Sequence, residues 1–307
     1  MKILFVKTSS LGDVVHNCPA VSDAARAFPG AEIDWVVEEA FAAVPAMHAR
    51  VRRVIPVALR RWRRELARPA AWSEFSAFRR ALAAERYDAV VDSQGLMKSV
   101  FICKLASGTL HGLDRASARD RLAPCFYDRT YNVPWSLHAV ERNRMLSARA
   151  LGYETSEPPD YCLRESRQRQ QPPAPYAVFL TMTSRAEKLW PEARWSELAR
   201  TLGTRVVLPW GDAAEQARAR RIAAGLADAL VPPHMSLEEL GSLFLGASHV
   251  VGVDTGLTHL AAALDARTLG IYCGTDPAKY GLLARNAANV GGEGRPPAVE
   301  EVVRGLA

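Results

Sequence analysis

Cysteine is scarce in this chain, and the few cysteines follow no pattern. There are five in 307 residues, Cys18, Cys103, Cys125, Cys162 and Cys273, and no two form a Cys-x-x-Cys pair. An odd and scattered set argues against a disulfide framework and against a zinc site. We therefore expect a protein of the reducing cytoplasm.

Long apolar runs are also missing. No uninterrupted stretch of about 18 apolar residues occurs, although a membrane-spanning helix needs that length. The apolar run within the opening MKILFVK is too short for a signal peptide and is typical of a first β-strand. No segment is therefore predicted to cross a membrane.

Several ligand-binding signatures are absent as well. The glycine fingerprint of dinucleotide-binding domains is missing, and so is any Asp-x-Asp that would clamp a nucleotide through a metal ion. The basic residues come without a helix-turn-helix, RRM or zinc-finger signature. These absences weaken the interpretations as an oxidoreductase or a nucleic-acid-binding protein, and neither a metal nor a cofactor is predicted.

The chain has a positive net charge, and its composition is that of an ordinary globular protein. Its formal net charge is +6 and its pI is near 9.2, which favours anionic partners such as phosphates, acidic sugars or an anionic membrane surface. Apolar residues make up 49% and charged residues 23%, as in soluble globular proteins. The length suits two domains.

Short β-branched runs alternate with helical patterns, which predicts an α/β architecture with parallel sheets. In the first half we expect strands at 2–8, 32–37, 53–58 and 87–92 and helices at 14–27, 72–86, 95–106 and 138–152. In the second half we expect strands at 176–182, 205–209, 229–231, 249–253 and 268–273 and helices at 191–202, 212–226, 236–247 and 298–306.

A polar, proline-rich stretch at 164–175 separates the two halves and is predicted to be a linker. It divides the chain into domains 1–163 and 176–307. The terminal helix of the second domain is a candidate to pack back on the first.

The segment Lys7 to His16 predicts a strand, a polar turn with Gly12, and a helix. In open α/β sheets, ligands bind at the carboxyl ends of strands near a reversal of strand order. Asp13 at such a turn has two interpretations. It could be the N-cap of the helix, or a general base that takes a proton from an acceptor hydroxyl.

A second segment of this kind is Val253 to His259, which contains Asp254, Thr255 and Gly256. Free N–H groups at the start of the predicted helix would suit a pyrophosphate, and Asp254 could bind sugar hydroxyls. Capping by Asp254 or Thr255 is the alternative. Lys188 follows the first strand of this half and is either a solvated lysine or a cation for the leaving group.

The stretch Arg60-Arg61-Trp62-Arg63-Arg64 places four guanidiniums around one indole. It predicts either a solvated charged turn or a site that recognises phosphates or carboxylates.

Taken together, these segments resemble the lipopolysaccharide heptosyltransferase I family, which has the GT-B glycosyltransferase fold. The resemblance runs along nearly the whole chain. It is carried by KTSSLGDVVH at 7–16, DWVVEEAFA at 34–42, VIPVALRRWRR at 54–64, YDAVVDSQGLMKS at 87–99, HAVER at 138–142, LPWG at 208–211, VDTGLTHL at 253–260 and TDP at 275–277. It implies two Rossmann-like domains that face each other across a cleft.

The resemblance also implies roles for individual residues. Asp13 matches the catalytic base, and Lys188 matches the lysine that neutralises the departing ADP. The donor side comprises Thr183, Ser184, Lys188, Glu215, Met235, Asp254, Thr255, Gly256 and His259. The acceptor side comprises Lys7, Ser10, Arg60, Arg61, Arg63, Arg64 and Arg119.

The implied reaction is transfer of L-glycero-D-manno-heptose from ADP-heptose to the inner Kdo of Kdo2-lipid A, with inversion and without a metal ion. We expect a monomer on the cytoplasmic face of the inner membrane, held peripherally by the anionic leaflet. The alternatives that remain open are a paralogue with the same donor and another acceptor, a nucleotide-dependent oxidoreductase, and a nucleic-acid-binding protein.

Overall fold

The computed structural model describes residues 1–65, 67–155, 157–164 and 175–306. The chain forms two compact units, Met1–Leu163 and Arg164–Ala307. Most of the predicted linker, 164–175, lies outside the described residues.

The first unit is a six-stranded, wholly parallel sheet with the order β3-β2-β1-β4-β5-β6. Its strands are β1 (Lys2–Val6), β2 (Glu32–Glu38), β3 (Arg53–Val57), β4 (Arg86–Asp92), β5 (Ser107–Leu113) and β6 (Arg129–Tyr131). In the central strands, Ile3–Val6 of β1 and Ala89–Asp92 of β4 are buried, as expected for parallel strands covered on both faces.

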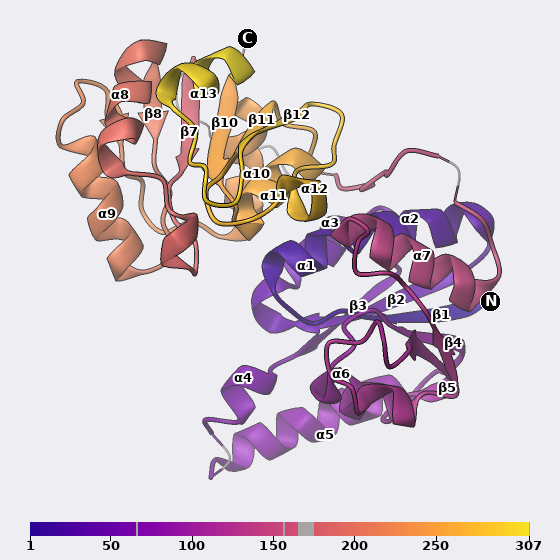
Figure 1. Cartoon of the computed structure of the whole chain (residues 1–307). Coiled ribbons are helices and arrows are strands. Elements are labelled where there is room, and N and C mark those ends of the chain that lie inside the picture. Colours follow the sequence, from indigo (N-terminus) through magenta and orange to yellow (C-terminus); the bar gives the residue numbers. More distant parts are fainter. Residues whose placement is uncertain (66, 156, 165–174, 307) are drawn as a thin grey trace. The chain divides into compact units, whose positions relative to one another are not determined.

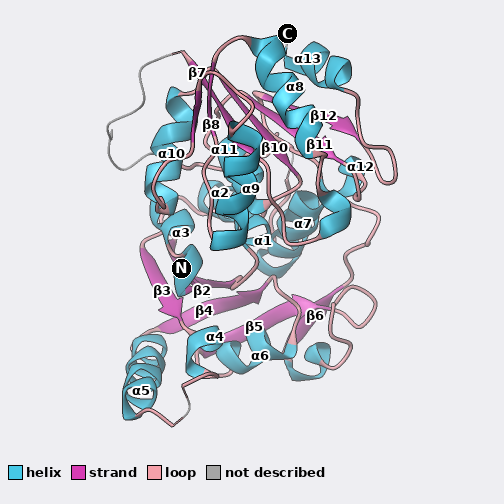
Figure 2. Cartoon of the chain, turned by 90° about the vertical axis from the view of Figure 1, so that its left-hand side faces the viewer, coloured by secondary structure: helices cyan, strands magenta, loops and turns pink. Residues whose placement is uncertain are grey.

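Helices cover both faces of this sheet (Figure 1). One face carries α1 (Leu11–Val15), α2 (Cys18–Ala27), α3 (Ala43–Met47) and α7 (Ala139–Leu151). The other carries α4 (Leu59–Trp62), α5 (Pro69–Ala83), α6 (Met97–Cys103) and the 3-10 turn η2 (Ala123–Phe126). Figure 2 shows α5 and α6 on the opposite side of β4 and β5 from α1 and α3.

The second unit repeats the plan with the order β12-β11-β10-β7-β8-β9, again wholly parallel. Its strands are β7 (Tyr176–Leu180), β8 (Arg205–Val207), β9 (Ala229–Leu230), β10 (His249–Val253), β11 (Thr268–Tyr272) and β12 (Ala287–Gly291). Its helices are α8 (Glu192–Leu202), α9 (Ala213–Ala223), α10 (Leu237–Gly246), α11 (Gly256–Ala263), α12 (Pro277–Tyr280) and α13 (Val299–Leu306), with a 3-10 turn η3 (Ala186–Lys188).

The terminal helix α13 uses its apolar face within its own unit. It packs on α8, β11 and β12, and Val299, Val302 and Leu306 join the core around Trp190 and Trp195. The apolar face of α13 is therefore buried within the second unit. From the sequence, this helix was a candidate to pack on the first unit.

The expected elements are present, with some differences. The predicted helix 14–27 is two helices, α1 and α2, because the chain turns at His16–Asn17 ahead of Pro19. The predicted strand 2–8 ends at Val6, so Lys7 belongs to the following loop. Strands β5, β6 and β12 were not predicted. Glycines interrupt the apolar pattern of β5 and end β12, and β6 is only three residues long.

In each sheet the strand order reverses beside the first strand of the unit. In the first unit, β2 and β3 are added in turn on one side of β1, and the chain then crosses over to place β4 on the other side of β1. In the second unit it resumes at β10 on the other side of β7. Loops at the carboxyl ends of these paired strands lie where open α/β sheets bind ligands.

Candidate active site

Asp13 lies in the first turn of α1, at the carboxyl end of β1. Its Oδ2 accepts hydrogen bonds from the Ser10 backbone N–H at 3.1 Å and from Ser10 Oγ at 3.3 Å. Its Oδ1 lies 3.1 Å from Arg119 Nη2. The side chain keeps 20% of its surface exposed. One carboxylate oxygen is thus anchored to the turn, while the other pairs with a half-exposed arginine.

The interpretation of Asp13 as the N-cap of α1 is wrong. Ser10 occupies that position, and Asp13 follows three residues later. Its bond back to the Ser10 N–H is the N3 half of a capping box, so it does satisfy one free backbone donor. This bond fixes the carboxylate at the loop and leaves Oδ1 for other partners.

Opposing effects act on the acidity of Asp13. Burial raises its pKa, but the charges of Lys7, Arg119 and His16 and the Ser10 N–H together hold it below its usual value. Asp13 is therefore an ionised carboxylate at neutral pH, which is the state that can accept a proton.

Lys7 is an internal cation beside this carboxylate. It is buried, and its Nζ donates to the Ser93 carbonyl at 2.6 Å and to Asn143 Oδ1 at 3.3 Å. Burial lowers the pKa of Lys7 to about 8, against the opposing charge of Asp13. These hydrogen bonds tie Lys7 to the loop after β4 and to α7. Its contact with an acceptor stays a prediction.

The loop after β4 holds the loop after β1. Gln94 Oε1 accepts hydrogen bonds from the N–H groups of Thr8 at 3.0 Å and Ser9 at 3.2 Å. Lys98 Nζ donates to Ser9 Oγ at 2.7 Å. Neither Gln94 nor Lys98 was predicted from the sequence as a site residue. Their position directly after an apolar strand, in DSQGLMK, was the signal that could have found them.

Arg119 reaches Asp13 from a braced loop between β5 and η2. Asp114 Oδ1 accepts from the N–H groups of Ala116 at 3.1 Å and Ser117 at 2.9 Å. Trp135 Nε1 donates to the Ala116 carbonyl at 3.0 Å, and Arg142 Nη2 donates to the Ser117 carbonyl at 2.9 Å.

The two bracing side chains also support each other. The Arg142 guanidinium lies 3.5 Å from the centre of the Trp135 ring, a cation–π contact. The orientation of Arg119 therefore depends on side chains that do not touch Asp13.

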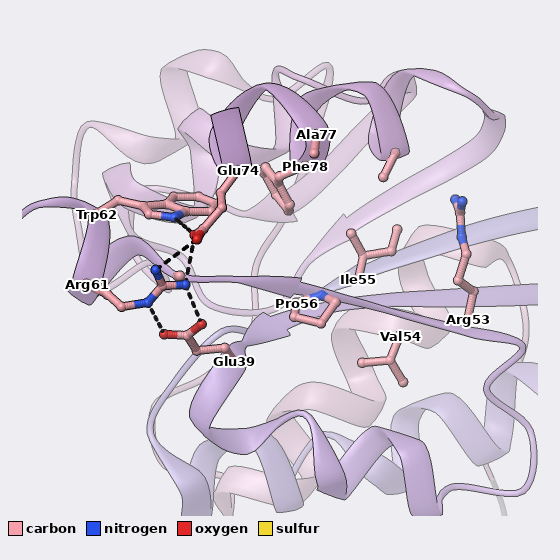
Figure 3. A pocket seen from close by; sticks show the side chains of 12 residues that line it. Glu39, Arg53, Val54, Ile55, Pro56, Arg61, Trp62, Glu74, Ala77 and Phe78 are labelled. Atoms are coloured by element: carbon pink, nitrogen blue, oxygen red, sulfur yellow. Dashed lines mark hydrogen bonds and ion pairs between the residues drawn. The ribbon is translucent and has the colours of Figure 1, made fainter. Parts of the chain in front are cut away.

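The arginine stretch at 60–64 is divided between structural and exposed roles. Arg61 bonds Glu39 at 2.9 Å and Glu74 at 2.8 Å, and Trp62 Nε1 donates to Glu74 at 2.8 Å (Figure 3). Trp62 is buried in the core beneath the sheet. These contacts position α4 against α5, so Arg61 is already satisfied by carboxylates.

The remaining arginines of this stretch face solvent. Arg63 and Arg64 are exposed, and Arg60 lies 5.6 Å from the centre of the Phe41 ring. Beside them, β3 and α5 form the walls of a pocket of about 380 Å³ with Arg61 and Glu74 at its rim (Figure 3). Arg60, Arg63 and Arg64 remain open to an anionic ligand.

In the second unit, Asp254 collects three partners at the carboxyl end of β10. Its Oδ2 accepts from Lys188 Nζ at 2.7 Å and from Thr275 Oγ1 at 2.6 Å, and its Oδ1 lies 3.4 Å from His259 Nε2. The Thr183 hydroxyl donates to the Asp254 backbone carbonyl at 3.0 Å. Segments after β7, β10 and β11 thus converge on one carboxylate.

The cluster corrects two alternatives of the sequence analysis. Asp254 does not cap α11, because Thr255 stands at that position, and Thr255 makes no side-chain capping bond. Lys188 is not a solvated lysine, since 16% of its side chain is exposed and it pairs with Asp254. Thr275, within the TDP segment, was not named as a site residue and is a direct partner of this carboxylate.

Opposing effects also act on the acidity of Asp254. Burial raises the pKa of Asp254, but its hydrogen bonds to His259, Lys188 and Thr275 hold the pKa far below its usual value. The adjoining helix α11 begins at Gly256, and its N-cap residue Thr255 leaves the first N–H groups without a capping bond from its side chain. A helix N-terminus and an ammonium together attract phosphate oxygens.

The other predicted donor residues lie along the same edge of the second sheet. Glu215 Oε2 accepts from the Gly211 N–H at 2.6 Å after β8, and Met235 follows β9 next to His234. Ser184 is exposed two positions before the η3 turn. Among the described residues, no hydrogen bond or ion pair joins Glu215, Met235 or Ser184 to the Asp254 cluster.

Within residues 1–65, 67–155, 157–164 and 175–306, no group of three or more His, Cys, Asp or Glu side chains could hold a metal ion. None of the helices in that part of the chain has the length and apolar character to cross a bilayer.

Comparison with known proteins identifies the family. The model of glycosyltransferase family 9 (heptosyltransferase) matches residues 75–303. Lipopolysaccharide heptosyltransferase 1 of Pseudomonas aeruginosa is 50% identical over 95% of this chain and 84% of its own length. The chain belongs to glycosyltransferase family 9. The corresponding protein of Escherichia coli is 48% identical over 93% of this chain and 92% of its own.

Solved structures of a heptosyltransferase confirm the resemblance and the fold. The Escherichia coli heptosyltransferase WaaC with ADP superimposes with a TM-score of 0.88 at 43% identity, covering 99% of this chain and 98% of that one. WaaC with ADP-2-deoxy-2-fluoro heptose gives 0.87 at 44% identity, with the same coverage. The predicted pair of Rossmann-like domains in a glycosyltransferase is confirmed.

Proposed function

We propose that this enzyme transfers L-glycero-D-manno-heptose from ADP-heptose to the inner Kdo of Kdo2-lipid A during synthesis of the lipopolysaccharide core. The observation that carries the proposal is the Asp254 cluster, in which Lys188 stands beside the uncapped start of α11. Relatives about half identical to this chain bear the name lipopolysaccharide heptosyltransferase 1.

The donor site is proposed to lie on the second unit. A diphosphate at the start of α11 would accept hydrogen bonds from the backbone N–H groups that begin at Thr255. It would also accept one from the ammonium of Lys188. The Asp254 carboxylate would orient Lys188 and bind hydroxyls of the sugar. A nucleotide-heptose donor agrees with the related structures of WaaC with ADP and with ADP-2-deoxy-2-fluoro heptose.

The chemical step is proposed as a single displacement with inversion. The acceptor hydroxyl loses its proton to Asp13, and its oxygen forms a bond to the anomeric carbon. The bond from that carbon to the diphosphate oxygen breaks, and ADP leaves with the electron pair. Lys188 and the start of α11 stabilise the charge that develops on the leaving group.

The acceptor is proposed to bind the first unit through its anionic groups. Arg60, Arg63 and Arg64 are exposed beside the pocket between β3 and α5, whereas Arg61 and Arg119 already pair with carboxylates. Planar guanidiniums suit carboxylates and phosphates, both of which Kdo2-lipid A carries. Ser10 donates to Asp13 and is exposed, so it can also meet the acceptor sugar.

The proposal also covers the oligomeric state of the enzyme, its location and its cofactor needs. We expect a monomer that works at the cytoplasmic face of the inner membrane, where its lipid acceptor resides, and that needs no metal ion and binds no nucleic acid. The basic first unit would add electrostatic attraction to an anionic leaflet.

The test is incubation of the purified enzyme with ADP-heptose and Kdo2-lipid A, with and without a metal chelator, and mass analysis of the product. We expect a gain of one heptose in both arms. A gain only without chelator would overturn metal independence. Transfer to a different lipid or sugar but not to Kdo2-lipid A would identify a paralogue with another acceptor.

A further inference from the structure

Four large apolar side chains stand exposed on one layer of the first unit. On the face formed by α4, α5, α6 and η2, Trp72 is 58% exposed, Phe101 51%, Leu122 62% and Phe126 43%. Single exposed apolar residues are ordinary on protein surfaces. Several on one layer need a reason, because contiguous apolar patches mark sites of interaction.

These side chains follow one another across neighbouring elements. The Phe101 ring of α6 stacks on the Phe75 ring of α5, with ring centres 6.2 Å apart. Trp72 precedes Phe75 by three residues and therefore shares its side of α5. On the far side of α6, η2 packs against that helix and brings Leu122 and Phe126 alongside. We call the row from Trp72 through Phe101 to Leu122 and Phe126 the apolar row.

Basic side chains accompany each part of the apolar row. Arg79 follows Trp72 by seven residues and therefore lies on the same side of α5. Lys104 follows Phe101 by three residues at the end of α6. Arg121 directly precedes Leu122. All three are exposed, and none forms an ion pair with any residue that the structure describes. Their charges are available to a partner.

We propose that the apolar row and its three basic companions dock this enzyme on an anionic lipid bilayer. Aromatic rings favour the interface between headgroups and acyl chains, and lysine and arginine are attracted to anionic headgroups. The combination is that of surfaces which lie on a membrane and do not cross it. The inference rests on the proposed function, because a lipid acceptor must be met at a bilayer.

The same layer adjoins the catalytic loop. Arg119 contacts Asp13, and Leu122 follows it by only three residues, a chain length that spans at most about 11 Å. At the other border, Lys98 in the first turn of α6 bonds Ser9, and Phe101 follows three residues later. A sugar headgroup can therefore reach Asp13 while its acyl chains remain in the bilayer.

The charge of the surface is tested by co-sedimentation of the full chain with phosphatidylglycerol vesicles and with neutral phosphatidylcholine vesicles. We expect binding to the anionic vesicles alone, weakened by salt. Arg79→Gln, Lys104→Gln and Arg121→Gln should each lower the partition constant about fivefold, the effect of one charge near an anionic surface.

The apolar part is tested by Trp72→Ser and Leu122→Ser, each expected to lower binding roughly tenfold. Leu230→Ser and Leu245→Ser are the matched controls, because both leucines are 40% exposed on the second unit. Circular dichroism and thermal melting of each variant exclude misfolding as the cause. Equal binding to both kinds of vesicle, or unchanged binding by all five first-unit variants, would overturn the proposal.

An activity arm separates this inference from the proposed function. With vesicle-borne Kdo2-lipid A, the surface variants should show a raised KM, whereas transfer to a deacylated, water-soluble Kdo acceptor should match wild type. Bilayer binding without heptose transfer to either acceptor would refute the proposed function and leave the docking surface standing. Transfer to both acceptors with wild-type KM in every variant would refute the docking surface alone.

Discussion

Replacing Arg119 by glutamine removes the guanidinium whose Nη2 lies 3.1 Å from Asp13 Oδ1. At this distance two unit charges interact by about 1.3 kcal/mol in water and by about 5 kcal/mol at an effective dielectric constant of 20. The Arg119 side chain is 44% exposed, so solvent screening places the interaction near the lower value. About 1.4 kcal/mol corresponds to a tenfold change in an equilibrium constant.

The sign of the effect on the pH profile follows from the ionised state of Asp13. Lys7, Arg119 and His16 hold the pKa of Asp13 below its usual value, so the base is available down to low pH. Without Arg119 the pKa of Asp13 rises, and protonation removes the base at a higher pH. The acid limb of kcat/KM should therefore move to higher pH by about one pH unit.

The assay is heptose transfer at limiting acceptor concentration from the acid limb to neutral pH. Arg119→Lys retains the charge and should leave the limb close to that of wild type. A role of Arg119 confined to acceptor binding would raise KM at every pH and leave the limb in place. An unmoved acid limb in a folded Arg119→Gln variant would refute the electrostatic coupling to Asp13.

Further predictions concern the base, the donor site, the brace of the Arg119 loop and the packing of β10. Asp13→Asn should lower kcat by about 10²–10⁴-fold. Lys188→Ala should raise the donor KM and lower kcat together. Trp135→Leu loosens the brace of the Arg119 loop and should shift the acid limb in the direction of Arg119→Gln with an unchanged donor KM. Gly252→Ala places a Cβ 2.1 Å from Thr258 Oγ1 and should destabilise the fold by about 1–3 kcal/mol.

These expectations are checked by steady-state kinetics with each substrate varied, and by denaturant unfolding for Gly252→Ala. Near-normal turnover by Asp13→Asn would remove its role as the base. Unchanged donor parameters in Lys188→Ala would remove that lysine from the donor site. A Trp135→Leu profile identical to wild type would show that the loop holds Arg119 without the brace. Wild-type stability of Gly252→Ala would show that Thr258 can move aside.

Much of this protein could be predicted from local sequence pattern. The strands of both sheets that are buried on two faces are short apolar runs, so the pattern of neighbouring residues reveals them. Asp13 and Asp254 each follow such a strand, and parallel topology brings strand ends to one edge whatever the details of packing. Fold class and family were therefore readable from the sequence, and so was the place of both carboxylates directly after a buried strand.

The tertiary structure decided which charges meet. Asp13 pairs with a residue 106 positions away, and Lys188 pairs with one 66 positions away. Such pairs depend on how distant loops are packed. For the same reason, Arg61 could not be recognised beforehand as a residue already held by carboxylates. The sequence by itself determined where reactive side chains stand along the chain; folding determined which are paired, which are buried and which remain free to bind.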